Sequence, residues 1–210
     1  IFEAEVVPVL QPYLGSRNDI RARLAAVCLF DDSVEHCGDA AAARYAPMLI
    51  EGILRGIDDS TNGGETELKR AAIYGIAQIA RHAPSDVLSD HARLLTQELC
   101  RLTSVAKEQS ADVAVYENAV SALAALVLFD GAPFRSSGFV KRPTILETFL
   151  RSLPLREDED EARICHSGLC DLIESSAIDV VTERGRLEGI ISNVLALVEE
   201  GEEIAMNETC

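Results

Sequence analysis

Apolar residues recur along this chain at the three- and four-residue spacing of one face of an α-helix. Four segments align without gaps, and their starts at 18, 67, 114 and 160 are separated by 49, 47 and 46 residues. Each segment has a small residue at the same place, followed at once by an aliphatic residue and three residues later by another apolar one. The small residues are Ala26, Gly75, Ala122 and Gly168, the aliphatic ones Val27, Ile76, Leu123 and Leu169, and the last Phe30, Ile79, Leu126 and Leu172.

A small residue at the centre of an apolar face lets a neighbouring helix approach closely. We therefore expect the four small residues to lie where the two helices of each repeat press together. Further helices of similar length are predicted between the aligned ones, roughly over 40–57, 86–104, 142–153 and 184–199. Turn-forming residues separate the helices at 60–64, 130–133 and 136–138. A two-helix unit that recurs every 46–49 residues is typical of HEAT and armadillo repeats.

The sequence thus predicts an all-α fold, a right-handed HEAT-repeat solenoid of about four repeats with partial repeats at its ends. We expect residues 1–210 to form a single segment, with repeats roughly at 1–37, 39–83, 86–130 and 140–176 and a partial one at 183–210. The chain begins with Ile1 and not with Met, so we expect it to be a piece of a longer protein. In that case apolar residues that would stack on a missing repeat are partly uncovered, namely Val6, Val7, Val9 and Leu10.

The composition supports helices and narrows the choice of partners. Hydrophobic residues make up 48% of the chain and aromatic residues only 5%, which suits close helix packing. No apolar run approaches the roughly 18 residues of a membrane span. The net charge of −16 disfavours nucleic acid as a partner and favours a basic protein, although acidity can also serve solubility alone. The six cysteines show no CxxC pair, and Cys28, Cys100, Cys165 and Cys170 are predicted to be small buried residues in a reducing compartment.

Several segments resemble, in order, a known family. The stretch 27–37 (VCLFDDSVEHC) resembles a segment near the C-terminal end of the importin beta family, nearest to its beta-3 branch. Stretches further along resemble the family's following repeats, at 71–77, 117–122, 153–158, 169–175 and 200–202. The resemblance implies the C-terminal HEAT repeats of a nuclear transport receptor.

The resemblance also implies partners. Members of the family carry basic cargo proteins with nuclear localisation signals into the nucleus, release them on binding Ran-GTP, and bind phenylalanine-glycine nucleoporins in transit. The receptor would shuttle between cytoplasm and nucleus. The main Ran contacts of the family lie in N-terminal repeats outside this chain. Two alternatives are a HEAT scaffold or regulatory subunit of another complex, such as a phosphatase, and an enzyme with a helical lid.

Acidic residues are the candidate protein-binding groups. Asp31, Asp32 and Glu35 end a predicted helix, where the negative end of the helix dipole and mutual repulsion disfavour them. Such an arrangement suggests binding of a cargo Lys or Arg, but a neighbouring basic residue such as Arg81 could equally pair with them.

Two further acidic features stand out. Glu117 occupies a repeat position at which the other three segments have arginine. The run Glu157, Asp158, Glu159, Asp160 and Glu161 begins a predicted helix, where negative charge stabilises the helix end or, alternatively, attracts a basic partner.

No motif in the sequence predicts catalysis, a cofactor or a metal. His36 with Cys37, and His166 with Cys165 and Cys170, are spread along amphipathic helices and lack the paired loop spacing of zinc sites. Phosphate-binding glycine loops, nucleophile elbows and HExxH motifs are absent from the sequence. We therefore expect a protein that acts by binding other proteins and is not an enzyme.

Overall fold

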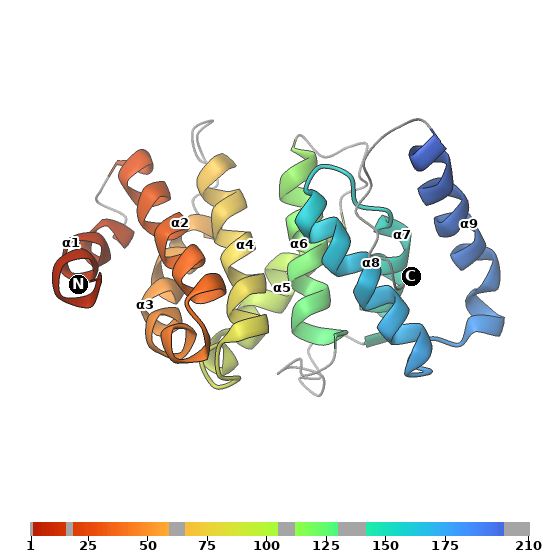
Figure 1. The fold of residues 1–210 in the computed structure, drawn as a ribbon, viewed down its shortest axis with the longest axis horizontal. Helices are drawn as coiled ribbons and strands as arrows, with labels where there is room; N and C mark the ends of the chain where they lie inside the picture. Colours follow the sequence, from red (N-terminus) through yellow and green to blue (C-terminus); the bar gives the residue numbers. More distant parts are fainter. Residues whose placement is uncertain (1, 16–18, 59–65, 105–111, 130–141, 200–210) are drawn as a thin grey trace. The chain divides into compact units, whose positions relative to one another are not determined.

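The structure is a computed structural model that describes residues 2–15, 19–58, 66–104, 112–129 and 142–199. All regular structure in these ranges is helical (Figure 1). The nine α-helices of the described residues are α1 (Val7–Leu10), α2 (Ile20–His36), α3 (Asp39–Asp58), α4 (Thr66–His82), α5 (Ala92–Thr103), α6 (Val113–Val127), α7 (Arg142–Ser152), α8 (Glu159–Glu174) and α9 (Val180–Glu199). Short π- and 3₁₀-helical turns are η1 (Phe2–Val6), η2 (Gln11–Leu14) and η3 (Ser89–His91).

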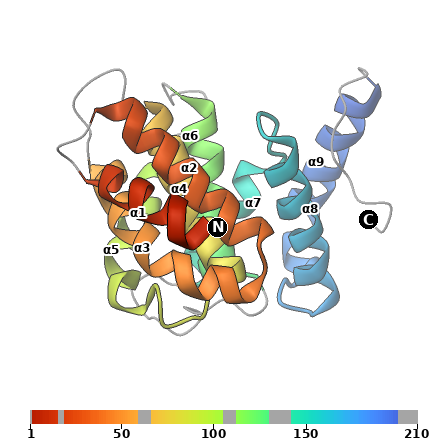
Figure 2. The same ribbon diagram turned by 60° about the vertical axis from the view of Figure 1, so that its left-hand side comes forward.

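The chain divides into two compact units, Ile1–Leu94 and Leu95–Cys210. In the first unit α2, α3 and α4 pack against one another, and η2 packs on α2 and α3. In the second unit α6 packs on α7 and α8, and α9 packs on α7 (Figure 2). Within each unit, helices therefore stack on their neighbours as in a HEAT-like array, which confirms the predicted all-α class. The right-handed sense of the stack stays a prediction.

The repeat register matches the core. The four aligned segments lie in α2, α4, α6 and α8, and all twelve matched small and apolar residues are buried. Ala26, Phe30 and Leu126 are completely inaccessible, and Leu169, the most exposed of the matched residues with a side chain, is only 8% exposed. The predicted intervening helices correspond to α3, α5, α7 and α9.

The two glycines among the small residues lie at close contacts between helices, but only one of these contacts joins the two helices of one predicted repeat. A Cβ atom at Gly75 would meet Asp31 of α2 and Ile53 of α3. A Cβ atom at Gly168 would instead meet the ring of Phe129, which follows α6 and belongs to the preceding predicted repeat. The ring of Phe129 fills the space that Gly168 leaves, and it packs edge-on against Phe149 of α7, with 5.8 Å between ring centroids.

Candidate functional site

The acidic residues at the end of α2 have three different environments. Asp31 is buried, with 2% of its surface exposed, whereas Asp32 is exposed. Glu35 is half-buried, and one of its carboxylate oxygens accepts a hydrogen bond of 2.5 Å from the hydroxyl of Tyr74 on α4. The predicted structural alternative thus applies to Glu35, with a tyrosine hydroxyl as the donor in place of the expected arginine. The same carboxylate also lies 3.8 Å from the imidazole of His36. Of these three residues, Asp32 is the one whose side chain is exposed to solvent.

Asp31 points into the helix packing. Its Oδ1 atom is fully buried and has no hydrogen-bond partner among the described residues. Burial raises the pKa of the Asp31 carboxyl well above its usual range, and the negative charges of Asp32 and Glu35 act in the same direction. A basic side chain of a partner cannot reach this carboxyl in the folded chain.

Glu117 holds the connection between α7 and α8. It lies on α6, is completely buried, and accepts backbone hydrogen bonds from Arg156 at 2.9 and 3.0 Å and from Glu157 at 2.8 Å. A carboxylate surrounded by backbone N–H groups is well satisfied, because charge-assisted hydrogen bonds are short and strong. Glu117 therefore positions the start of the acidic run and is itself covered.

The acidic run at 157–161 combines buried and exposed side chains. Asp158 is the N-cap of α8 and accepts a hydrogen bond of 3.0 Å from the backbone N–H of Glu161. The Glu161 side chain is buried and accepts a hydrogen bond from the hydroxyl of Ser121 on α6. Glu157, Glu159 and Asp160 are exposed, and Asp160 pairs with Arg163 at 2.6 Å.

The structure thus separates the nine predicted residues by exposure. Asp31, Glu117 and Glu161 are buried inside the helix packing, and Glu35 and Asp158 are half-buried and hydrogen-bonded within the chain. The side chains presented to solvent are Asp32, Glu157, Glu159 and Asp160. Their role in binding a partner stays a prediction, and these four are the groups on which it rests.

The neutral partners of these carboxylates were not predicted from the sequence. Tyr74 and Ser121 each join a carboxylate 39 or 40 residues away, on the next helix but one. Tyr116 makes a different link, between two hydroxyl groups on adjacent helices, because its hydroxyl lies 2.6 Å from that of Ser152 on α7. A hydroxyl on an otherwise apolar helix face was the available signal, since such a group requires a buried partner.

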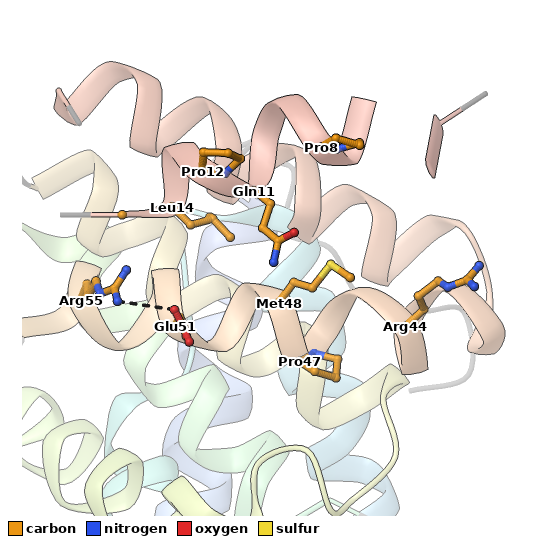
Figure 3. Close-up of a pocket in the computed structure, with 10 residues that line it drawn as sticks. Pro8, Gln11, Pro12, Leu14, Arg44, Pro47, Met48, Glu51 and Arg55 are labelled. Atoms are coloured by element: carbon orange, nitrogen blue, oxygen red, sulfur yellow. Dashed lines mark hydrogen bonds and ion pairs between the residues drawn. The ribbon is translucent and has the colours of Figure 1, made fainter. Parts of the chain in front are cut away.

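The first unit also contains a pocket of about 550 Å³ between the N-terminal turns and α3 (Figure 3). Half of its lining residues are apolar, namely Pro8, Pro12, Leu14, Pro47 and Met48, and Gln11 points toward Met48. The charged groups at its edges are paired. Arg44 forms an ion pair with Glu3, and Arg55 lies 3.4 Å from Glu51. The pocket therefore carries no excess charge that would select a ligand of one sign.

Exposed apolar residues occur near both ends of the described chain. Of the four predicted near the N-terminus, Val9 is 59% exposed, Val6 and Leu10 are half-buried, and Val7 is buried, contrary to the prediction. Val7 is covered because the turns of η1, α1 and η2 pack on one another. On α9, Val181, Ile191 and Leu195 are more than half exposed.

The described residues also bear on the expectations for metal sites, membrane-spanning helices and cysteines. No group of three or more His, Cys, Asp or Glu side chains in the described ranges is arranged to hold a metal ion. No helix there is long and apolar enough to cross a membrane. Among the cysteines expected to be buried, Cys165 is buried, Cys28 is exposed, and Cys100 and Cys170 are half-buried. Cys170 is disulfide-bonded, which the sequence did not predict, and Cys210 lies outside the described residues.

Comparison with known proteins finds a distant similarity to an importin. No family model matches the chain. A probable importin-5 homolog of Dictyostelium discoideum is 21% identical to it over 184 residues, which are 86% of this chain and 16% of that protein. The chain therefore spans less than a fifth of this relative. Together with the stacked helices, this similarity suggests a HEAT-repeat region of the importin-beta type.

Proposed function

We propose that the chain is part of a nuclear transport receptor that binds basic cargo proteins and works under Ran-GTP control. The observation that carries the proposal is the alignment along 86% of the chain with an importin-5 homolog, in a molecule whose described residues form stacked helix pairs. Such a protein acts by binding and not by catalysis. Its place of action would be the cytoplasm and the nucleus, between which it would shuttle.

The net negative charge of the chain supports the proposal that its cargo is basic. The chain carries 35 acidic and 19 basic residues, and its net charge of −16 attracts cationic segments over a distance. The exposed carboxylates of Asp32, Glu157, Glu159 and Asp160 are the part of the predicted site that a partner can reach. Because the Glu117 carboxylate fixes the backbone at 156 and 157, the start of this acidic run is held in place before a partner arrives.

The expected interaction is weak per residue and sensitive to salt. Exposed charges are screened beyond about 8–10 Å at physiological ionic strength. An exposed ion pair contributes only ~0.2–1 kcal/mol, so no single carboxylate decides the affinity. Nucleoporin binding and Ran-GTP binding are proposed for the full-length parent protein, since this chain covers only 16% of its relative.

The test compares two charge-reversed forms of the full-length receptor. In the first form Asp32, Glu157, Glu159 and Asp160 are changed to Lys. In the control form four other exposed acids are changed to Lys, namely Asp86, Asp90, Asp171 and Glu174, so the change in net charge is the same. Affinity for a basic nuclear-localisation peptide is measured at low and high salt, with and without Ran-GTP.

We expect the first form to lose more affinity than the control, and the difference to shrink at high salt. Ran-GTP should release the peptide from the wild-type receptor. Equal losses in both forms would show that only the net charge matters and not these four residues. Failure of the wild-type receptor to bind the peptide or Ran-GTP would contradict the proposed function itself.

A further inference from the structure

Asp31 lies where three helices of the first unit meet. It extends from α2 toward Gly75 of α4, and Ile53 of α3 borders the same space. The carboxyl occupies the room that the missing Cβ atom of Gly75 leaves. Only 2% of Asp31 is exposed, and its Oδ1 atom has no hydrogen-bond partner in the described ranges. A buried carboxyl without such a partner is costly to ionise.

The groups around Asp31 do not offset a negative charge. The charges that act on it are those of Asp32 and Glu35, both on α2 and both negative. On α4, the neighbouring Tyr74 donates its hydroxyl to Glu35, and Glu67 acts on the nearby thiol of Cys28. On α3, the apolar end of Ile53 borders the same space beside Gly75. Ionised Asp31 would therefore place an uncompensated charge between α2 and α4.

We propose that Asp31 makes the contact between α2 and α4 a proton-dependent joint, which is closed while the carboxyl is protonated and loosens when the carboxyl ionises. Loosening would take the form of water entering beside Gly75, because a buried carboxylate gains most from solvation. The Glu35–Tyr74 hydrogen bond spans the same two helices one turn further along α2, so it would be weakened together with the joint.

The direction of the pH effect follows from the protonation states. The pKa of Asp31 is raised in the folded chain, so folded Asp31 keeps a proton that the unfolded chain releases above its ordinary value of 3.8. The contribution of Asp31 to stability is full below this unfolded value and is lost as the pH rises toward the folded pKa. Within this window the unfolding equilibrium constant increases by up to about tenfold per pH unit.

Two neighbouring substitutions separate this effect from general repulsion in an acidic protein. Asp31→Asn removes the titrating group with little change of shape, and Asp32→Asn removes a carboxylate of the exposed neighbour as a matched control. Urea unfolding of the 210-residue chain is followed from pH 5 to pH 8 for all three proteins. The unfolding constant of the wild type divided by that of Asp31→Asn should rise with pH. The unfolding constant of the wild type divided by that of Asp32→Asn should rise less.

Parallel pH profiles for the wild type and Asp31→Asn would overturn the proposal. If Asp31→Asn does not fold, the carboxyl carbon of Asp31 in the wild-type chain is titrated by NMR. A midpoint well above 3.8, accompanied by faster hydrogen exchange of α4 amides as Asp31 ionises, supports the joint. A midpoint at the ordinary value, or α4 exchange that does not follow the titration, overturns it. The inference does not depend on the proposed cargo.

Discussion

At the scale of single residues, two neighbouring carboxylates of the second unit show that burial decides whether a carboxylate stabilises the fold or faces solvent. Glu117 is completely buried and accepts three backbone hydrogen bonds, while Glu157 is exposed and contributes only its backbone N–H to that arrangement. The same functional group therefore stabilises the fold in one place and is available to a partner in the other. A carboxylate becomes structural when N–H donors compensate for its lost hydration.

Glu117→Gln should destabilise the chain by about 1.5–3 kcal/mol, because hydrogen bonds to a charged acceptor are lost and one amide N–H₂ faces backbone N–H donors. Glu157→Gln serves as the control and should change stability by less than about 0.5 kcal/mol, since that side chain is exposed. Urea unfolding measures both. Equal effects of the two substitutions would mean that the Glu117 hydrogen bonds contribute little.

Two mid-helix glycines should respond oppositely to a methyl group. At Gly168 of α8 the added Cβ would run into the Phe129 ring, so Gly168→Ala should cost about 1–3 kcal/mol through overpacking. At Gly189 of α9 nothing lies within 4 Å of the new atom, so Gly189→Ala should gain up to ~1 kcal/mol from helix propensity. Thermal unfolding tests the pair, and a stabilising Gly168→Ala would show that Phe129 is not held against α8.

The sequence predicted the small residues correctly but not all of their neighbours. Periodicity placed Gly75 and Gly168 at the centre of buried faces, because matched apolar residues flank both. It could not predict that Phe129 reaches Gly168, since this contact depends on how the residues after α6 turn back toward α8. Nor did it separate buried from exposed acids. Asp31 lies four residues after Val27 and three before Val34, both buried, and this spacing was the overlooked signal.

At the scale of helices, aspartate side chains begin several of the described elements. Asp19, Asp112 and Asp158 are the N-caps of α2, α6 and α8, and each accepts at least one backbone N–H of the first turn. Such caps satisfy donors that have no partner within the helix. The ends of the intervening helices could be predicted within four residues from apolar spacing and turn residues, except that α5 begins at Ala92 and not at 86. The caps were not recognised.

Asp179 gives the start of α9 a pH dependence opposite to that of Asp31. Its carboxylate accepts hydrogen bonds from the hydroxyl and N–H of Thr182 and from the N–H of Val181, and these lower the pKa of Asp179. A lowered pKa means that the stabilisation is present above the ordinary value of 3.8 and is lost as the pH falls through the folded pKa.

The first turn of α9 should therefore lose amide protection below about pH 4. NMR signals of the Val181 and Thr182 amides report the change directly. Asp179→Asn retains a capping oxygen but does not titrate, so its first turn should respond less to acid. If both proteins lose protection over the same pH range, another group controls this helix end.

At the scale of the whole molecule, the two compact units should differ in their response to a core mutation. Ile73 of α4 is completely buried in the first unit, and Ile73→Ala should cost about 2–5 kcal/mol. In an array of repeats, stability is set by each repeat and its nearest neighbours. Hydrogen exchange should therefore accelerate strongly in α2, α3 and α4 and much less in α6 and α8.

The corresponding substitution in the second unit is Phe149→Ala, because Phe149 is 2% exposed and packs on Phe129. Its effect on exchange should be largest in α6, α7 and α8. Uniform acceleration over the entire chain by either mutation would indicate that the molecule opens as one cooperative body. The sequence alone predicted a single continuous array, because periodicity reports which faces are apolar and not how strongly successive helices couple.

The attachment of the α7–α8 connection to Glu117 has a consequence for how this protein can change over generations. Glu117 binds the main-chain N–H groups of Arg156 and Glu157, and these three hydrogen bonds involve no side-chain atom of either residue. Every amino acid except proline supplies the same N–H group. Mutations at these two sites can therefore alter the chemical character of the surface without loss of the anchor. Substitutions there should be tolerated widely, and lineages could acquire new partners at this spot, provided that the connection keeps its length and Glu117 is retained.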